Sequence, residues 1–361
     1  MRDKICISVI VPFYNAEHDI ERCLDVLSAQ EFSRSFEIVL VDDGSTDNSR
    51  RIAERHTCAN VKLFSLISNS GPAAARNVGL NKSVGEYILF LDVDDTIKNV
   101  TLEILYQTAK EDKCDLVICD KQRIENSVNQ REGIFLYPED RRLGDRDIIE
   151  AMRQRYFDPI TSMGLFGLTG RLIKRSIISN NKLQFEEKLR YWEDEIFSWD
   201  LFAYVHSITY VRRQLYAYHV NPNVNSGVSA GLDRPFPISN FKLARSRIKN
   251  SLQTRQFSSK VVEELSDQAL IFFIISALVS YSRSIILGKV DPMQGARVRR
   301  KMIDEVFADH EIVMAVSNYQ ASKEESQWIP RAIVWRSRKL LEAACIRRAK
   351  KVLDLRRTGR A

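Results

Sequence analysis

Three carboxylates follow directly on an apolar segment near residue 90. The stretch GEYILFLDVDDTI, residues 85–97, passes through five apolar or aromatic residues and ends on Asp92, Asp94 and Asp95. Four to eight apolar residues bounded by polar ones are typical of a covered strand, so these acids should lie just beyond its carboxyl end. Crowded carboxylates repel one another, and a divalent cation, which prefers oxygen ligands, would relieve that repulsion. The alternative is that Asp94 or Asp95 only caps the helix expected next.

Apolar segments alternate with helical ones over the first 120 residues. Strands are expected at 5–11, 36–41, 61–67, 85–91 and 114–120, with helical segments between them. Such alternation predicts an α/β fold whose parallel-rich central sheet carries helices on both faces. Ligands of these sheets bind beyond the carboxyl ends of the strands, where Pro12–Asn15, Asp42–Ser45 and Asp92–Asp95 would meet. Three polar clusters at one edge favour a binding site over three separate helix caps.

The usual glycine-rich phosphate loops are missing. No GxGxxG follows the first expected strand and no GxxxxGK[ST] occurs. The sequence therefore lacks the motifs that usually indicate a dinucleotide-binding or P-loop protein. The composition is that of an ordinary globular protein, with 44% hydrophobic and 28% charged residues among 361. Six cysteines without a CxxC pair, and no secretory signal, fit a reducing cytoplasm. The longest apolar run, 269–281, is shorter than the roughly 20 residues that cross a bilayer, so a buried helix is expected there.

Basic residues are concentrated at the C-terminal end. Residues 328–361 contain eleven Lys or Arg and two acids, whereas the whole chain has a net charge of only +7. The body of the chain therefore offers no basic groove for nucleic acid. Apolar residues recur among the basic ones, at Trp328, Ile333, Trp335, Leu340, Leu341, Ala344, Val352 and Leu353. This pattern predicts a basic amphipathic tail on an anionic membrane surface, the alternative being a helix packed on the protein.

Four segments in the first hundred residues carry a resemblance. SVIVPFYNAE, VDDGSTD, SGPAAARNVG and FLDVDD resemble, in order and spacing, the donor-binding half of glycosyltransferase family 2. The resemblance implies a GT-A fold, a nucleotide-diphospho-sugar donor and transfer with inversion at the anomeric carbon. It is good to about residue 120, thinner to about 230 and absent beyond. We therefore expect a catalytic domain at 1–237, made of a donor half (1–120) and an acceptor half (121–237), and a helical C-terminal region at 238–361.

The resemblance also assigns roles on the donor side. Asp43 would accept the uracil N3 hydrogen, and Pro12 and Tyr14 would line the base pocket. Arg76 would lie near the nucleotide, although a salt bridge to one of the neighbouring acids, Asp42 or Asp43, is an alternative. In the D-x-D pair, Asp92 would face the ribose or donor sugar, and Asp94 would bind Mn²⁺ or Mg²⁺.

A second acidic cluster lies in RYWEDEIFSWDLF, residues 190–202. Acids commonly occupy a helix start because they interact favourably with the dipole. The resemblance instead makes Asp194 the catalytic base, with Glu193 positioning a neighbour and Trp192 stacking on a sugar or filling core. Further on, His219 is a candidate for completing the metal shell or touching the diphosphate, although a lone histidine is more often structural. The loop at 216–231 lacks the arginine that the family often has there.

These assignments imply an inverting, metal-dependent glycosyltransferase. It would move a hexosyl or N-acetylhexosaminyl group from a UDP-sugar to a hydroxyl of a glycan acceptor. A lipid-linked acceptor would explain the basic tail and place the enzyme on the inner face of a bacterial membrane, in capsule, O-antigen or exopolysaccharide synthesis. A sugar-nucleotide-binding protein without turnover would not need Asp194. A nucleotidyltransferase usually has a glycine-rich basic loop where this chain has VPFYNAE.

Overall fold

The chain forms two compact units. A computed structural model describes residues 4–125, 129–131, 136–157, 165–189, 191–220, 236–320 and 328–357. The N-terminal unit comprises Met1–Met152 and Ile160–Asn223, and the C-terminal unit comprises Arg153–Pro159 and Val224–Ala361.

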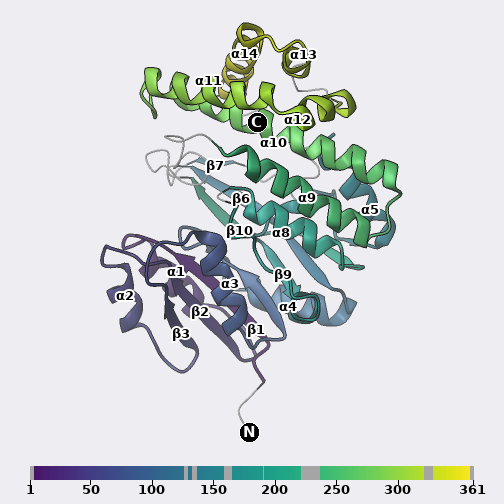
Figure 1. The fold of residues 1–361 in the computed structure, drawn as a ribbon. Helices are drawn as coiled ribbons and strands as arrows, with labels where there is room; N and C mark the ends of the chain where they lie inside the picture. The colour runs from purple at the N-terminus through teal and green to yellow at the C-terminus, as the bar shows by residue number, and fades with distance from the viewer. Residues whose placement is uncertain are drawn as a thin grey trace. The chain divides into compact units, whose positions relative to one another are not determined.

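The N-terminal unit is built on a sheet whose first part is parallel. Its strands are β1 (Ile7–Phe13), β2 (Phe36–Asp42), β3 (Val61–Ser65) and β4 (Tyr87–Phe90), side by side in the order β3-β2-β1-β4 (Figure 1). The first four expected strands are thus confirmed. The apolar side chains of β1 and β4 and most of those of β2 are buried because both faces of the sheet are covered there, whereas Leu63 and Phe64 of β3 are only partly buried.

The second part of the sheet is mixed. Beyond β4 the order continues β9-β6-β10-β5, and β7 and β8 pair with β6 and β10. These strands are β5 (Thr96–Ile97), β6 (Leu116–Glu125), β7 (Asn129–Arg131), β8 (Arg141–Leu143), β9 (Arg171–Lys174) and β10 (Ile208–Val220). The strand β9 runs antiparallel to both β4 and β6. The fifth expected strand is therefore confirmed as β6, but it does not lie next to β4, because the four-residue β9 is inserted between them.

Alternate residues of the strands face different helices. Val9 belongs to the core cluster formed with α1 (Ile20–Ser28) and α4 (Thr101–Asp112). Ile10 points the other way, toward α3 (Pro72–Lys82), where a Cβ on Gly79 would come within 2.3 Å of its Cγ2. On that face Phe90 also packs against Phe197 of α8 (Glu193–Phe202). The remaining helices of this unit are α2 (Ser49–Arg55), α5 (Asp145–Gln154) and α7 (Arg175–Asn180).

The C-terminal unit is helical around one long apolar helix. Its helices are α9 (Ile238–Thr254), α10 (Ser259–Ile286), α11 (Pro292–Ala308), α12 (His310–Ala315), η2 (Val316–Asn318), α13 (Trp328–Val334) and α14 (Arg338–Arg357). By length and composition α10 could cross a membrane, with a mean hydropathy of 1.9 in its most apolar window, of which 61% is buried. The expectation of a buried helix is confirmed. The helix extends well beyond the apolar run of 13 residues, so the expectation that it is too short to span a bilayer is wrong.

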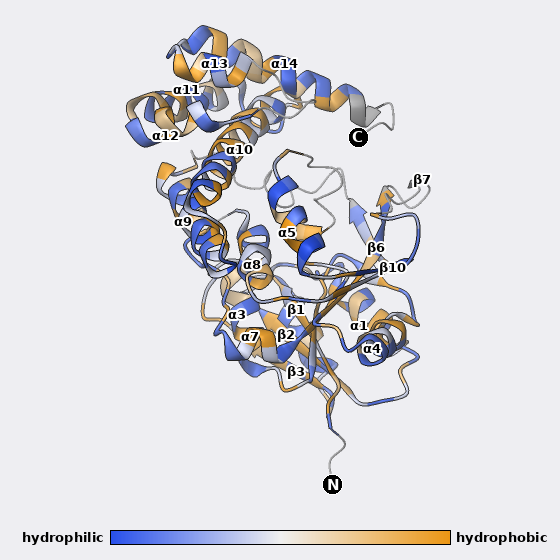
Figure 2. Cartoon of the chain, turned by 90° about the vertical axis from the view of Figure 1, so that its right-hand side faces the viewer, coloured by the Kyte–Doolittle hydropathy of each residue, from blue (hydrophilic) through white to orange (hydrophobic). Residues whose placement is uncertain are grey.

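The basic tail is part of this helical core. Helix α14 packs on α10, and Ile333, Leu341 and Ala344 are buried. Basic and apolar residues alternate along α14, as its mixed blue and orange colouring shows (Figure 2). The apolar face that sequence analysis assigned to a membrane is therefore largely used for packing. Among the described residues of the tail, the large exposed apolar side chains lie around α13, at Trp328 (46%), Val334 (50%) and Trp335 (60%).

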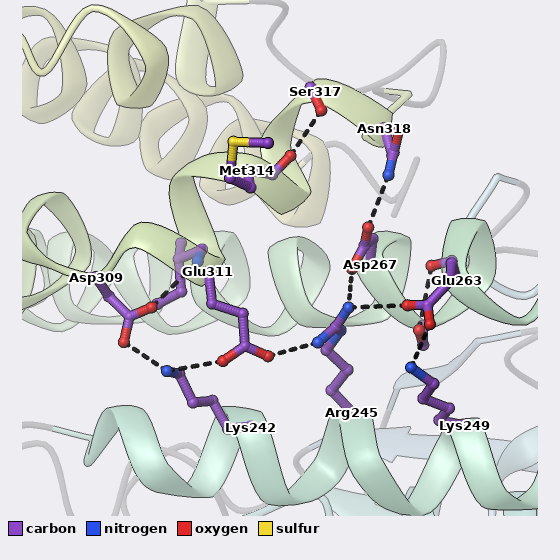
Figure 3. Close-up of polar contacts among 12 residues, drawn as sticks. Lys242, Arg245, Lys249, Glu263, Asp267, Asp309, Glu311, Met314, Ser317 and Asn318 are labelled. Atoms are coloured by element: carbon purple, nitrogen blue, oxygen red, sulfur yellow. Dashed lines mark hydrogen bonds and ion pairs between the residues drawn. The ribbon is translucent and has the colours of Figure 1, made fainter.

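Ion pairs join α9 to α10 and α12. Arg245 is mostly buried and pairs with Asp267, Glu263 and Glu311 (Figure 3). Lys242 on the same helix pairs with Glu311 and with Asp309. Buried charges of this kind stabilise a fold only when each has its partner. The positive charges of α9 shown here are thus neutralised within the unit.

Candidate active site

The ends of β1 and β2 bring together the residues expected to bind a base. Pro12 is buried opposite Val41 in the parallel register, and the exposed Tyr14 follows at the end of β1. The backbone N–H of Asp43 donates to the carbonyl of Phe13 at 2.8 Å. The structure thus places Pro12, Tyr14 and Asp43 at one edge of the sheet.

The carboxylate of Asp43 holds the loop that leads into α3. Its two oxygens accept hydrogen bonds from the backbone N–H groups of Ser70 (2.7 Å) and Gly71 (2.8 Å). Burial raises the pKa of Asp43, and these two hydrogen bonds oppose the rise. The chain passes close by at Gly44, where a Cβ would lie 2.6 Å from the carbonyl carbon of Ser68. A ligand that donates a hydrogen bond to Asp43 would therefore meet a carboxylate whose orientation is already fixed.

Arg76 on α3 connects two acids that are distant in sequence. Its guanidinium donates to Asp92 at 3.0 Å and to Glu193 at 2.9 Å, and it lies 5.6 Å from the ring centroid of Phe185. Burial lowers the pKa of Arg76, but the two acids outweigh that effect and raise it. Its salt-bridge partners are thus neither Asp42 nor Asp43, which sequence analysis had considered. The bridge joins the end of β4 to the start of α8.

The three aspartates after β4 have different environments. Asp95 is fully buried and accepts hydrogen bonds from the Tyr216 hydroxyl (2.5 Å) and the His219 backbone N–H (2.9 Å). Burial and nearby Asp92 raise its pKa to about 8. Asp95 therefore fixes β10 against this loop. Helix α4 begins at Thr101 with Val100 as N-cap, so the alternative that Asp94 or Asp95 caps that helix is wrong.

Asp94 is neither paired with Arg76, as Asp92 is, nor fully buried, as Asp95 is. Burial and the charge of Asp92 raise the pKa of Asp94 to about 6, which a bound cation would reverse. Within the described ranges no three His, Cys, Asp or Glu side chains converge as a metal site. A diphosphate offers oxygens of the kind that a divalent cation on Asp94 would accept as further ligands. The ring of His219 lies 2.9 Å from the Thr96 hydroxyl, and burial lowers its pKa.

The expected base lies at the start of α8. Trp192 has a left-handed backbone conformation (φ 61°), and the helix begins at the next residue. Asp194 accepts a hydrogen bond from the Glu195 N–H at 2.8 Å. Burial and the charge of Asp194 raise the pKa of Glu193 to about 7, and Arg76 opposes this rise. Through Arg76, the segment that carries Trp192, Glu193 and Asp194 is tied to Asp92 on the donor side.

Sequence analysis missed two cations of this region, Lys121 on β6 and Arg171 on β9. The amine of Lys121 donates to the Thr169 hydroxyl at 2.8 Å. Arg171 is buried, and burial lowers its pKa to about 9. The negative charge of Asp194 opposes that shift. A basic residue directly after an expected strand was the available signal for Lys121. The loop expected at 216–231 lies outside the described residues from 221 onward.

Comparisons with known proteins agree on a family. The model for glycosyl transferase family 2 matches residues 8–176. The glycosyltransferase GlyG of Streptococcus pneumoniae is 31% identical over 59% of this chain and 70% of its own length. EpsJ of Bacillus subtilis, described as an uncharacterized glycosyltransferase, is 30% identical over 60% of this chain, and this chain spans only 62% of EpsJ. The crystal structure of residues 1–349 of Staphylococcus aureus TarS with UDP-GlcNAc covers 98% of this chain and 92% of that chain, with a TM-score of 0.67 and 19% identity. That likeness shows a shared fold.

Proposed function

Since the chain belongs to glycosyltransferase family 2, we propose that it transfers a sugar from a UDP-sugar to a hydroxyl of a glycan acceptor. The observation that carries this proposal is the Arg76 bridge, which ties Asp92 to Glu193 and so to the neighbouring Asp194. A transfer site needs a donor-binding group and a base in one place. TarS, which shares the fold of this chain, was crystallised with UDP and with UDP-GlcNAc. This supports a UDP-sugar as donor.

The reaction needs one base and one departing diphosphate. The acceptor hydroxyl attacks the anomeric carbon on the face opposite the diphosphate and gives its proton to Asp194. A single displacement of this kind inverts the anomeric configuration. A positioned carboxylate base contributes roughly 100- to 10,000-fold to such a step. Asp43 would orient the uracil, with Pro12 and Tyr14 beside it.

Asp94 would hold Mn²⁺ or Mg²⁺ together with diphosphate oxygens. The metal would supply positive charge that stabilises the departing diphosphate. The raised pKa of Asp94 supports this role, because a crowded carboxylate gains most from a cation. His219 is a weaker candidate ligand, since its ring lies at hydrogen-bonding distance from Thr96.

For the transferred group and the acceptor we propose the following. The transferred sugar is a hexosyl or N-acetylhexosaminyl group. The acceptor is a lipid-linked glycan, an intermediate in the synthesis of a cell-surface polysaccharide such as capsule, O-antigen or exopolysaccharide. TarS of S. aureus is named a poly(ribitol-phosphate) beta-N-acetylglucosaminyltransferase, which supports a polymeric acceptor and an N-acetylhexosaminyl group.

We further propose that the enzyme is cytoplasmic and binds the inner face of the membrane through its C-terminal tail. Trp328, Val334 and Trp335 are exposed beside the exposed basic residues Arg331 and Arg336. Tryptophan next to cations suits the boundary between lipid headgroups and acyl chains. Each Lys or Arg near an anionic surface adds about 1 kcal/mol of attraction.

Release of UDP tests this function. Purified enzyme is incubated with a panel of UDP-sugars and Mn²⁺, with and without lipid-linked and soluble glycan acceptors, and with Asp194→Asn as a control. We expect acceptor-dependent release of UDP from one donor and little release by the variant. Binding of a UDP-sugar without any release would indicate a binding protein. Release of pyrophosphate from UTP and a sugar 1-phosphate, with no release of UDP from any UDP-sugar, would indicate a nucleotidyltransferase.

A further inference from the structure

We propose that Lys121 binds a phosphoryl oxygen of the donor diphosphate and stabilises it as it leaves. This inference rests on the proposed UDP-sugar donor. Its basis is that Tyr216, the neighbour of Lys121 in the sheet, contacts the aspartates that follow β4, and that no carboxylate of the described residues pairs with the Lys121 amine.

Lys121 reaches the donor side through Tyr216. The two residues are neighbours in the parallel register of β6 and β10, and the Lys121 amine lies 5.9 Å from the centroid of the Tyr216 ring. The hydroxyl of that ring is 2.5 Å from the Asp95 carboxylate and 3.4 Å from the Asp92 backbone nitrogen. Lys121 lies in the middle of β6, and Tyr216 connects it to the segment that follows the carboxyl end of β4, where ligands of such sheets bind.

The surroundings of Lys121 leave its charge without a direct counterion. One of its N–H groups reaches the Thr169 hydroxyl, and no carboxylate of the described residues lies within 4.0 Å of its amine. Lys62 and Lys110 in the same unit each pair with a glutamate. A partly buried ammonium without a counterion is costly. A bound anion would remove that cost.

The local chain makes room for the lysine. Gly170 has a φ of 72°, and a Cβ at this position would lie 3.3 Å from Cε of Lys121. Glycine at this position therefore allows the positive φ of the turn before β9 and leaves space for the Lys121 side chain.

A diphosphate is the anion that the proposed reaction brings to this place. As the acceptor oxygen bonds to the anomeric carbon, the bond from that carbon to the β-phosphate oxygen breaks and its electron pair stays on the phosphate. The acceptor proton goes to Asp194. An ammonium beside the phosphate therefore stabilises the charge that develops, as preorganised cations do at other phosphoryl groups.

The charge of Lys121 should depend on pH near neutrality. Burial, followed by the charge of Arg171, lowers the pKa of Lys121 to about 8, while Cys119, Asp92 and Asp95 act in the opposite direction. Tyr216 lies over the amine, and its own pKa is raised far above the usual value. Since only the charged form attracts phosphate, UDP affinity should fall as the pH rises from about 7 to 9.

Calorimetric binding of uridine and of UDP, with Mg²⁺ present, tests the proposal. Lys121→Met should weaken UDP binding about 10- to 100-fold, the loss expected for one charge-assisted hydrogen bond, and change uridine binding less than about twofold. Lys121→Arg should retain UDP binding and lose the decline in affinity between about pH 7 and 9. The matched control is Lys110→Met, which removes a lysine paired with Glu86 at the opposite end of β4 and should bind as the wild type does.

The outcomes separate this inference from the proposed function. A folded Lys121→Met variant that binds UDP as tightly as the wild type would overturn the role of Lys121. Equal losses for uridine and UDP would also overturn it, because the defect would then be a distorted base pocket. If the wild type itself binds no UDP, the proposed donor class fails and this inference fails with it. Circular dichroism and the melting temperature establish that each variant is folded.

Discussion

The pair of Arg76 and Glu193 should be strongly coupled, and a double-mutant cycle measures that coupling. The side chains are only 9% and 13% exposed, and their charged atoms are 2.9 Å apart. Hydrogen bonds to charged groups contribute about 1.5–3 kcal/mol, and exposed ion pairs usually less than about 1 kcal/mol. We expect a coupling free energy of about 2 kcal/mol from Arg76→Met, Glu193→Gln and the double variant. Arg76→Met alone should cost about 3 kcal/mol or more, because it leaves two acids without their partner.

The assay must report on the N-terminal unit alone. The chain has four tryptophans, of which Trp192 and Trp199 lie in the N-terminal unit and Trp328 and Trp335 in the C-terminal unit. Replacing the latter two by phenylalanine lets fluorescence in urea follow the N-terminal unit. Measurements at pH 8 keep Glu193 ionised wherever Arg76 is present, because its pKa is then about 7. At pH 5.5 Glu193 is protonated, so the coupling should fall.

A matched cycle on an exposed pair provides the control. Arg22 and Asp19 are 2.8 Å apart, but their side chains are 42% and 38% exposed. Their coupling should stay below about 1 kcal/mol. A coupling between Arg76 and Glu193 no larger than that of the control pair, or one that does not change between pH 8 and pH 5.5, would refute the reasoning.

Three further variants test separate parts of the proposal. Asp194→Asn should lower kcat by about 100-fold or more and keep UDP affinity within about twofold; a collapse of UDP affinity with high residual turnover would make Asp194 a binding residue. Asp94→Ala should abolish stimulation by Mn²⁺ while the melting temperature stays close to that of the wild type, and full Mn²⁺ stimulation would contradict the metal role. The double variant Trp328→Ser with Trp335→Ser should float less with anionic liposomes at low salt and remain folded, since both side chains are exposed. Equal flotation of wild type and variant would count against this surface. Truncation after Gln327 is unsuitable for that test, because it removes core residues of the C-terminal unit.

The strands that sequence analysis found and the one it missed differ in length and pattern. Segments such as those of β1 and β2 are continuous apolar runs bounded by polar residues, so the local sequence indicates them directly. Strand β9 has four residues with a charge at each end. It is a strand only because β4 and β6 lie on either side of it, which no local pattern reveals.

The same limit applies to partners. An amphipathic pattern in the tail correctly marked Ile333, Leu341 and Ala344 as a face to be covered. The pattern does not reveal whether a membrane or another part of the protein contacts this face. In the structure, other helices of the C-terminal unit pack against it. Likewise, Arg76 was expected to need an acid, and the acids nearest along the proposed edge were considered. Glu193 is 117 residues away and reaches Arg76 only through the packing of α8 on the sheet.

The charges left unpaired at the candidate site explain why a metal and a diphosphate would bind together. Arg76 balances Asp92 and Glu193, and Asp95 is held by hydrogen bonds and has a pKa raised to about 8. In the part of the chain that the structure describes, the Asp94 carboxylate has no ion pair, although Arg22 donates to the Asp94 backbone carbonyl at 2.8 Å, and the Lys121 amine has no carboxylate within 4.0 Å. A direct pair between them would close the site without a ligand. The proposed diphosphate with a divalent cation would satisfy both groups at once, because the cation would join Asp94 and a phosphate oxygen would join Lys121. Either partner alone would leave one of the two groups without a counterion.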